Sequence, residues 1–109
     1  MSRVTNMIFS FSISEDEEER IKEVNAYQYR GLQMNLISAD FNKDTENRTV
    51  WYGGSKFLET PLYVGAFNYF DLEPFIEHFK TIKWEEPEYV QVIVKEQEEN
   101  KFKILDINI

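Results

Sequence analysis

The chain has 109 residues, of which 12 are basic and 20 acidic, so its formal net charge is −8. It contains no cysteine, which excludes disulfides, thiolate catalysis and cysteine-ligated zinc. The negative charge disfavours direct binding to nucleic acid or to an anionic membrane, and no apolar run approaches the roughly 18 residues that span a bilayer. Aromatic residues make up 16% of the chain, which argues against disorder. The length is that of one folded domain, which we expect over residues 1–109. The lack of cysteine and of a long apolar run leads us to expect a cytoplasmic protein.

The first half of the chain begins with a strand pattern and continues with a helix start. Apolar residues alternate with serines over residues 7–13, which predicts a half-buried strand. Ser14, followed three positions later by Glu17, is typical of a capping box and predicts a helix over residues 15–25.

A turn and two further strands are expected next. Gly31 marks the turn, and residues 32–38 suit a second strand. Residues 39–48 are polar and rich in turn formers, so we expect a long hairpin loop. It leads to a third strand over residues 49–52, which ends at Gly53 and Gly54.

The second half repeats this order. Residues 62–70 are apolar on both faces, as expected of a central strand. Asp71 is a natural N-cap for a helix over residues 72–82. The helical spacing directs three of its side chains to the core: Phe75, Ile76 and Phe79. Alternating valines predict a strand over residues 89–96, and a polar turn separates it from a closing strand over residues 102–109.

Together these elements predict an α+β fold, in which two β-α-β-β units form a mainly antiparallel sheet of about six strands with two helices. The two predicted caps, Ser14 and Asp71, precede the strands that begin at residues 32 and 89 by the same spacing, but few residues are identical. The two halves therefore repeat the order of their elements and not their sequence. This doubled order resembles the paired modules of the glyoxalase-like fold in architecture alone, because that family's metal ligands have no counterpart here.

The sequence offers little material for catalysis. His78 is the single histidine, at the rim of the second helix's apolar stripe, and one imidazole cannot build a zinc site. Asp40, Asn42 and Asp44 have the alternate spacing of a calcium loop, but the central glycine and the terminal glutamate are missing. Carboxylate pairs occur in hydrophilic runs, where burial is not expected to raise a pKa. We therefore expect no enzyme activity, no cofactor and no metal site.

Five consecutive acids, residues 15–19, stand at the start of the first predicted helix. An acid in the first turn stabilises a helix by about 0.3–1 kcal/mol, but neighbouring acids repel one another. Helix stabilisation thus accounts for two or three of the five. The excess serves either general solubility or the attraction of a cationic partner.

The favoured hypothesis is a small acidic intracellular binding protein. Its short length, negative charge, aromatic content and lack of cysteine are similar to those of immunity proteins, which occlude the basic surface of a bacterial toxin. In a variant of this hypothesis, the basic partner is a DNA-binding protein instead of a toxin. The candidate contact residues are Glu15, Asp16, Glu17, Glu18, Glu19, Trp51, Tyr52, Trp84, Glu85 and Glu86. The alternatives are a structural or regulatory domain that self-assembles, as in a homodimer, or joins a larger complex, and a pocket protein or enzyme.

Overall fold

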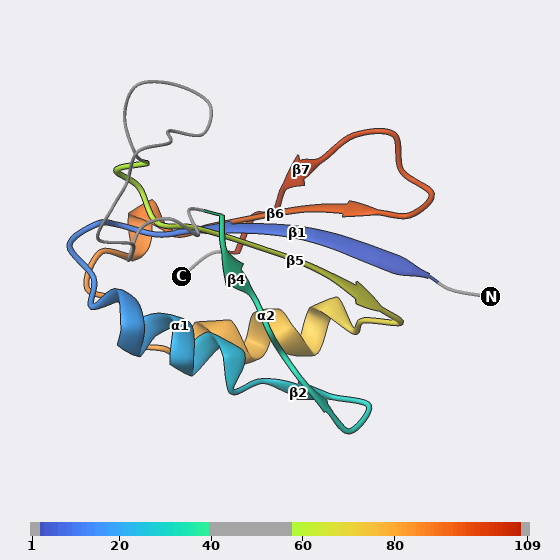
Figure 1. The fold of residues 1–109 in the computed structure, drawn as a ribbon, viewed down its shortest axis with the longest axis horizontal. Helices are drawn as coiled ribbons and strands as arrows, with labels where there is room; N and C mark the ends of the chain where they lie inside the picture. Colours follow the sequence, from blue (N-terminus) through green and yellow to red (C-terminus); the bar gives the residue numbers. More distant parts are fainter. Residues whose placement is uncertain (1–2, 40–57, 108–109) are drawn as a thin grey trace, which may run out of the picture.

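The computed structural model describes residues 3–39 and 58–107. Figure 1 shows its elements in chain order. They are β1 (Val4–Ser10), α1 (Glu17–Asn25), β2 (Gln28–Tyr29), β3 (Leu32–Gln33), β4 (Ile37–Ser38), β5 (Leu62–Asn68), α2 (Leu72–Lys80), the 3₁₀ turn η1 (Pro87–Tyr89), β6 (Gln91–Glu96) and β7 (Lys103–Ile104). The α+β class, with an antiparallel sheet and two helices, is confirmed.

The main sheet has the order β4-β5-β1-β6-β7, and every neighbouring pair is antiparallel. The central strand is β1, and both of its neighbours, β5 and β6, come from the second half of the chain. The two halves are therefore interleaved and do not form separate paired modules. Apart from the β2–β3 hairpin and β7, the element order is the β-α-β-β-α-β order of ferredoxin-like folds. That order carries no functional conclusion by itself.

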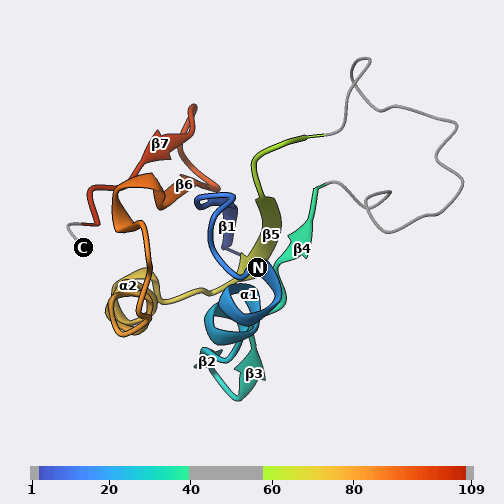
Figure 2. The same cartoon turned by 90° about the vertical axis from the view of Figure 1, so that its left-hand side faces the viewer.

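Both helices lie on one face of the sheet, as Figures 1 and 2 show. The core lies between the two layers, because alternate side chains of β1, β5 and β6 point towards the helices. As predicted, Phe75 and Phe79 of α2 are fully buried, and Ile76 packs partly buried at their side. The Phe79 ring centroid lies 4.9 Å from that of Phe9 on β1, in an edge-to-face contact.

The predicted strand over residues 32–38 is divided between two sheets. Its first part, β3, pairs with β2 in the hairpin, whereas its last part, β4, pairs with β5 at the edge of the main sheet. Met34 and Leu36 between them are buried, so the chain bends to insert these side chains into the core. The turn at Gly31 is confirmed by its φ of +76°, a conformation that glycine adopts without a steric penalty.

The first predicted strand and helix have different limits. β1 ends at Ser10, and Ile13 is exposed because the chain turns away from the sheet, with the Glu15 amide donating to the Ser12 carbonyl at 3.2 Å. α1 therefore begins two residues later than predicted. Its N-cap is Asp16, whose carboxylate accepts from the Glu19 amide, and not Ser14.

Four limits in the second half also differ. The strand predicted over residues 62–70 is β5, which ends at Asn68. The predicted strand over residues 89–96 is shorter, because Pro87 starts the 3₁₀ turn η1 and β6 begins only at Gln91. α2 ends at Lys80, and the closing strand is reduced to β7. Several predictions fall outside the described residues. They are the third strand over residues 49–52, the glycine pair after it, and the loop residues Asp40, Asn42 and Asp44.

Candidate functional site: the acidic end of the sheet

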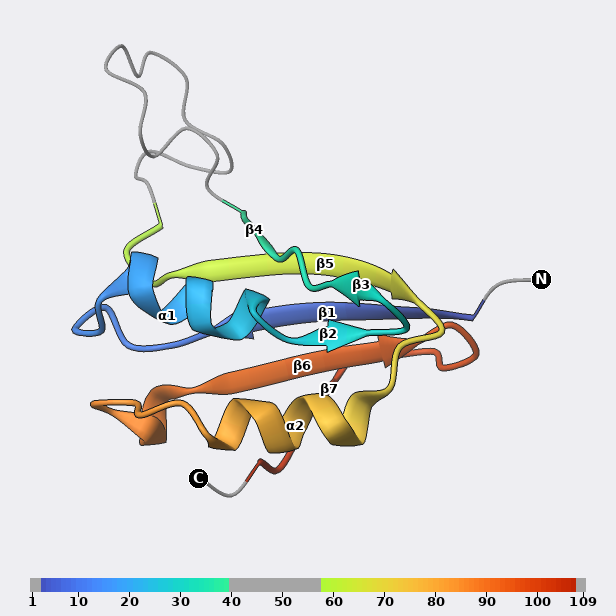
Figure 3. The same cartoon turned by 90° about the horizontal axis from the view of Figure 1, so that it is seen from below.

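Carboxylates gather at one end of the molecule. Figures 1 and 3 show this end, where β1 ends and β5 and β6 begin. Antiparallel pairing sets Ser10 opposite both Leu62 and Gln91, so the segments next to these residues meet at that end. We call this region the acidic end. Its exposed or half-buried acids are Asp16, Glu17, Glu18, Glu19, Glu59, Glu85, Glu86 and Glu88. The structure thus brings together the acidic run and the Glu85–Glu86 pair.

Glu15 has a different place from the rest of the run. It is only 6% exposed, and its two carboxylate oxygens accept from the Arg20 guanidinium at 2.9 Å and from the Glu86 amide at 2.8 Å. Arg20 also donates to Glu23 at 2.7 Å, and the Ser12 hydroxyl donates to the Glu86 carboxylate at 2.9 Å. Glu15 therefore fastens the 85–86 segment to the start of α1 and is not part of a contact surface.

These contacts also set the ionisation of Glu15. Burial by itself raises the pKa of this carboxyl group, but the backbone amides of Glu86 and Glu85 and the guanidinium of Arg20 outweigh it. The pKa of Glu15 therefore lies below its ordinary value. The carboxylate stays charged, and Arg20 compensates that charge inside the fold.

The exposed acids surround a small apolar surface. Ile13, Leu58 and Tyr89 are each more than half exposed, although their side chains are large and hydrophobic. A hollow of about 500 Å³ extends from Ile13 to Tyr89, and a second of about 200 Å³ lies between Ile13 and Leu58. Glu59 lines both hollows, so a carboxylate stands beside the apolar side chains in each.

The predicted aromatic anchors are not all available. Trp84 is half-buried, and its ring packs 5.2 Å from Phe79 and 5.6 Å from Phe11, so it contributes mainly to the core. Trp51 and Tyr52 lie outside the described residues. Of the predicted acids, Glu17 is half-buried and accepts from the Tyr63 hydroxyl, which leaves Asp16, Glu18, Glu19 and Glu85 as exposed contact candidates, with Glu86 half-buried.

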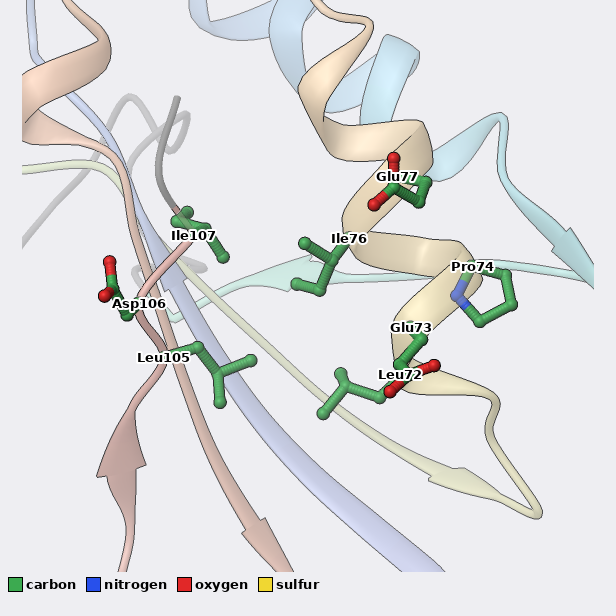
Figure 4. Close-up of a pocket in the computed structure, with 8 residues that line it drawn as sticks. All are labelled: Leu72, Glu73, Pro74, Ile76, Glu77, Leu105, Asp106 and Ile107. Atoms are coloured by element: carbon green, nitrogen blue, oxygen red, sulfur yellow. The ribbon is translucent and has the colours of Figure 1, made fainter.

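A separate groove lies along α2, away from the acidic end. It has a volume of about 580 Å³ and is drawn in Figure 4 between the first turns of α2 and residues 105–107. Leu72, Ile76, Leu105 and Ile107 form its apolar lining. The acids Glu73, Glu77 and Asp106 also line it. The molecule thus has a second group of carboxylates, separate from those of the acidic end.

Catalytic and metal-binding groups are scarce in the part of the chain that the structure describes. No three His, Asp or Glu side chains there are placed to hold a metal ion. The His78 Nε2 donates to the Glu23 carbonyl at 2.9 Å, so this histidine links α2 to the last turn of α1. Neither described helix has the length and hydropathy needed to span a bilayer.

Sequence reasoning missed the apolar part of the site. Ile13 continued the alternation of the first strand and was expected to face the core, and Tyr89 was expected within a strand. Leu58 and Glu59 carried no motif. The antiparallel pairing of β1 with β5 and β6 would have placed all four at one end, but strand order is not readable from the pattern of a single chain.

Comparisons with known proteins give no relative from which a function could be transferred: no family model, no curated protein and no solved structure matches this chain.

Proposed function

We propose that the protein is a binding protein whose acidic end covers a basic surface of another macromolecule, as an immunity protein does with a bacterial toxin. The observation that carries this proposal is the juxtaposition of Ile13, Leu58 and Tyr89, all exposed, with the carboxylates around them. Protein interfaces typically combine an apolar centre that supplies binding energy with a polar rim. A protein that acts by occlusion needs no catalytic group of its own.

The charge supports a cationic partner. The acidic end carries its carboxylates on three separate segments of a chain with net charge −8. Long-range attraction from such a surface raises the rate of encounter with a basic protein, whereas contacts at the apolar centre slow dissociation. The two parts of the site therefore predict separate kinetic effects.

The proposal is tested by capture from a host lysate at low salt, followed by binding kinetics with the captured partner. Replacing Glu18, Glu19 and Glu85 with lysine should lower the association rate by about one to two decades at low salt, since these acids are exposed. Added salt should slow wild-type association in the same way, because ~0.15 M ionic strength screens charges beyond about 8 Å. Tyr89→Ala should mainly speed dissociation.

A matched control separates the site from overall charge. Lysine at Glu73, Glu77 and Asp106, around the α2 groove, changes the net charge by the same amount at another location. This variant should associate nearly as fast as wild type. If both triple variants lose the same factor in association rate, only net charge matters. If the association rate of the variant at Glu18, Glu19 and Glu85 is unchanged, the acidic end is not the contact surface.

A further inference from the structure

The face of the main sheet opposite the helices carries a continuous aliphatic row. One residue from each strand contributes to it, in the order Ile37, Val64, Ile8, Ile93 and Ile104. Each is the direct cross-strand partner of the next. The row therefore crosses all five strands of the sheet without interruption.

This row is not covered by any described helix, as Figures 1 and 2 show. Ile37 and Ile104 at its two ends are 58% and 63% exposed. A hollow of about 600 Å³ lies over the middle of the face, with Ile8, Val64 and Ala66 among its lining residues and Phe102, 46% exposed, at its side. An apolar surface that crosses a whole sheet is typical of an interaction site.

The charges on this face identify its occupant. The polar side chains that β1, β5 and β6 direct to this face are Asn6, Ser10, Asn68, Gln91 and Lys95. Among the described residues, no strand of the main sheet places a carboxylate there. In the part of the chain that the structure describes, carboxylates stand only at the acidic end of this face, where Glu59 and Glu86 line a hollow with Ser10 and Gln91. The strands themselves therefore offer a basic partner little attraction. A second copy of this acidic chain, in contrast, would meet no carboxylate on these strands.

We propose that two copies of the chain associate through this sheet face. A two-fold pair places the same surface on both sides, so the row of one copy packs on the row of the other and each Phe102 can enter the opposite hollow. The width of the face is four strand spacings of about 4.8 Å, and its length is that of a seven-residue strand that rises about 3.3 Å per residue. The product is a contact area of roughly 400 Å² per copy. This area is an upper bound, because β4 and β7 have only two residues each. It is about half of the roughly 800 Å² per partner of a standard interface, so the dimer is weak and concentration-dependent.

Sedimentation equilibrium between about 1 and 500 µM protein tests this proposal. The wild type should shift from monomer to dimer over that range. Ile37→Lys combined with Ile104→Lys should weaken dimerisation at least tenfold, because it sets four buried cations in the interface. Ile13→Lys, an equally exposed isoleucine at the acidic end, should dimerise like wild type.

Salt distinguishes this interface from the one proposed at the acidic end. Because the two copies are both negative, added salt should strengthen dimerisation, whereas it weakens binding of a basic partner. Dilution of the wild type should also shift the methyl resonances of Ile8 and Ile93, which tests the contact even if the double variant fails to fold. A wild type that stays monomeric at 500 µM would overturn the second copy as occupant and leave the face to another protein. Dimerisation that survives the double substitution in a folded protein, or that Ile13→Lys abolishes, would overturn the location.

Discussion

Glu15 shows how one residue of an apparently uniform run takes a separate role. Asp16, Glu18 and Glu19 are exposed, whereas the carboxylate of Glu15 is enclosed by Arg20 and the amide of Glu86. A buried ion pair of this kind adds little by its mere presence, but removing one member leaves the other without compensation. The run therefore contains one buried structural acid, Glu15, and a half-buried one, Glu17, that accepts from the Tyr63 hydroxyl. Its three exposed acids remain for contact with a partner.

Glu15→Gln should lower the free energy of unfolding by about 1.5–3 kcal/mol at pH 7, since the amide replaces a charged acceptor. The folded-state pKa of Glu15 is below its unfolded value, so the stabilisation is present above the unfolded value and is lost as the pH falls through the folded pKa. Urea unfolding at several pH values from 7 down to 3 should thus show the two proteins converging in acid. Glu18→Gln, an exposed acid of the same run, serves as control and should change stability by less than about 0.5 kcal/mol. A constant gap at every pH would contradict this role.

At the scale of elements, hydrophobic periodicity predicted α2, β1 and β6. The helix α1 was predicted from a capping box, and β5 from an apolar run. Phe75 and Phe79 were placed in the core because they repeat at helical spacing, and they are fully buried. Limits were harder to predict where two residues compete for one role. Ser14 and Asp16 both suit an N-cap, with Glu17 and Glu19 three positions on, and the choice depends on Glu15 being drawn towards Glu86.

This competition can be measured. Asp16→Ala should lower stability by about 1 kcal/mol, because the Glu19 amide loses its acceptor. Ser14→Ala should have an effect within about 0.5 kcal/mol, since Ser14 lies outside the helix. Thermal unfolding of both variants compares the two positions directly, and a larger effect at Ser14 would restore the capping box that the sequence suggested.

For the molecule as a whole, the sequence indicated the fold class but not the arrangement of the strands. The acidic end, the hollow beside Ile13 and the aliphatic row from Ile37 to Ile104 all depend on β1 lying between β5 and β6. Each of these surfaces joins residues that are distant in the chain. A single sequence carries the periodicity of each strand but no signal for which strands are neighbours, so the candidate site was predicted only in part.

The central place of β1 has a consequence for how the protein is made. Thr5, near the N-terminus, hydrogen-bonds to Glu96, 91 positions later, so the middle strand leaves the ribosome before either of its neighbours exists. Synthesis at about 5–20 residues per second leaves the apolar side chains of β1 and α1 without partners for several seconds. Folding that waits for such distant pairing is also slow, in the range of milliseconds to seconds. A fragment that ends at Pro61 should therefore show no cooperative thermal transition, and a native-like near-ultraviolet dichroism from that fragment would contradict this order of events. In the cell, we expect chaperones to bind the chain mainly during synthesis, while the apolar side chains of β1 and α1 are exposed.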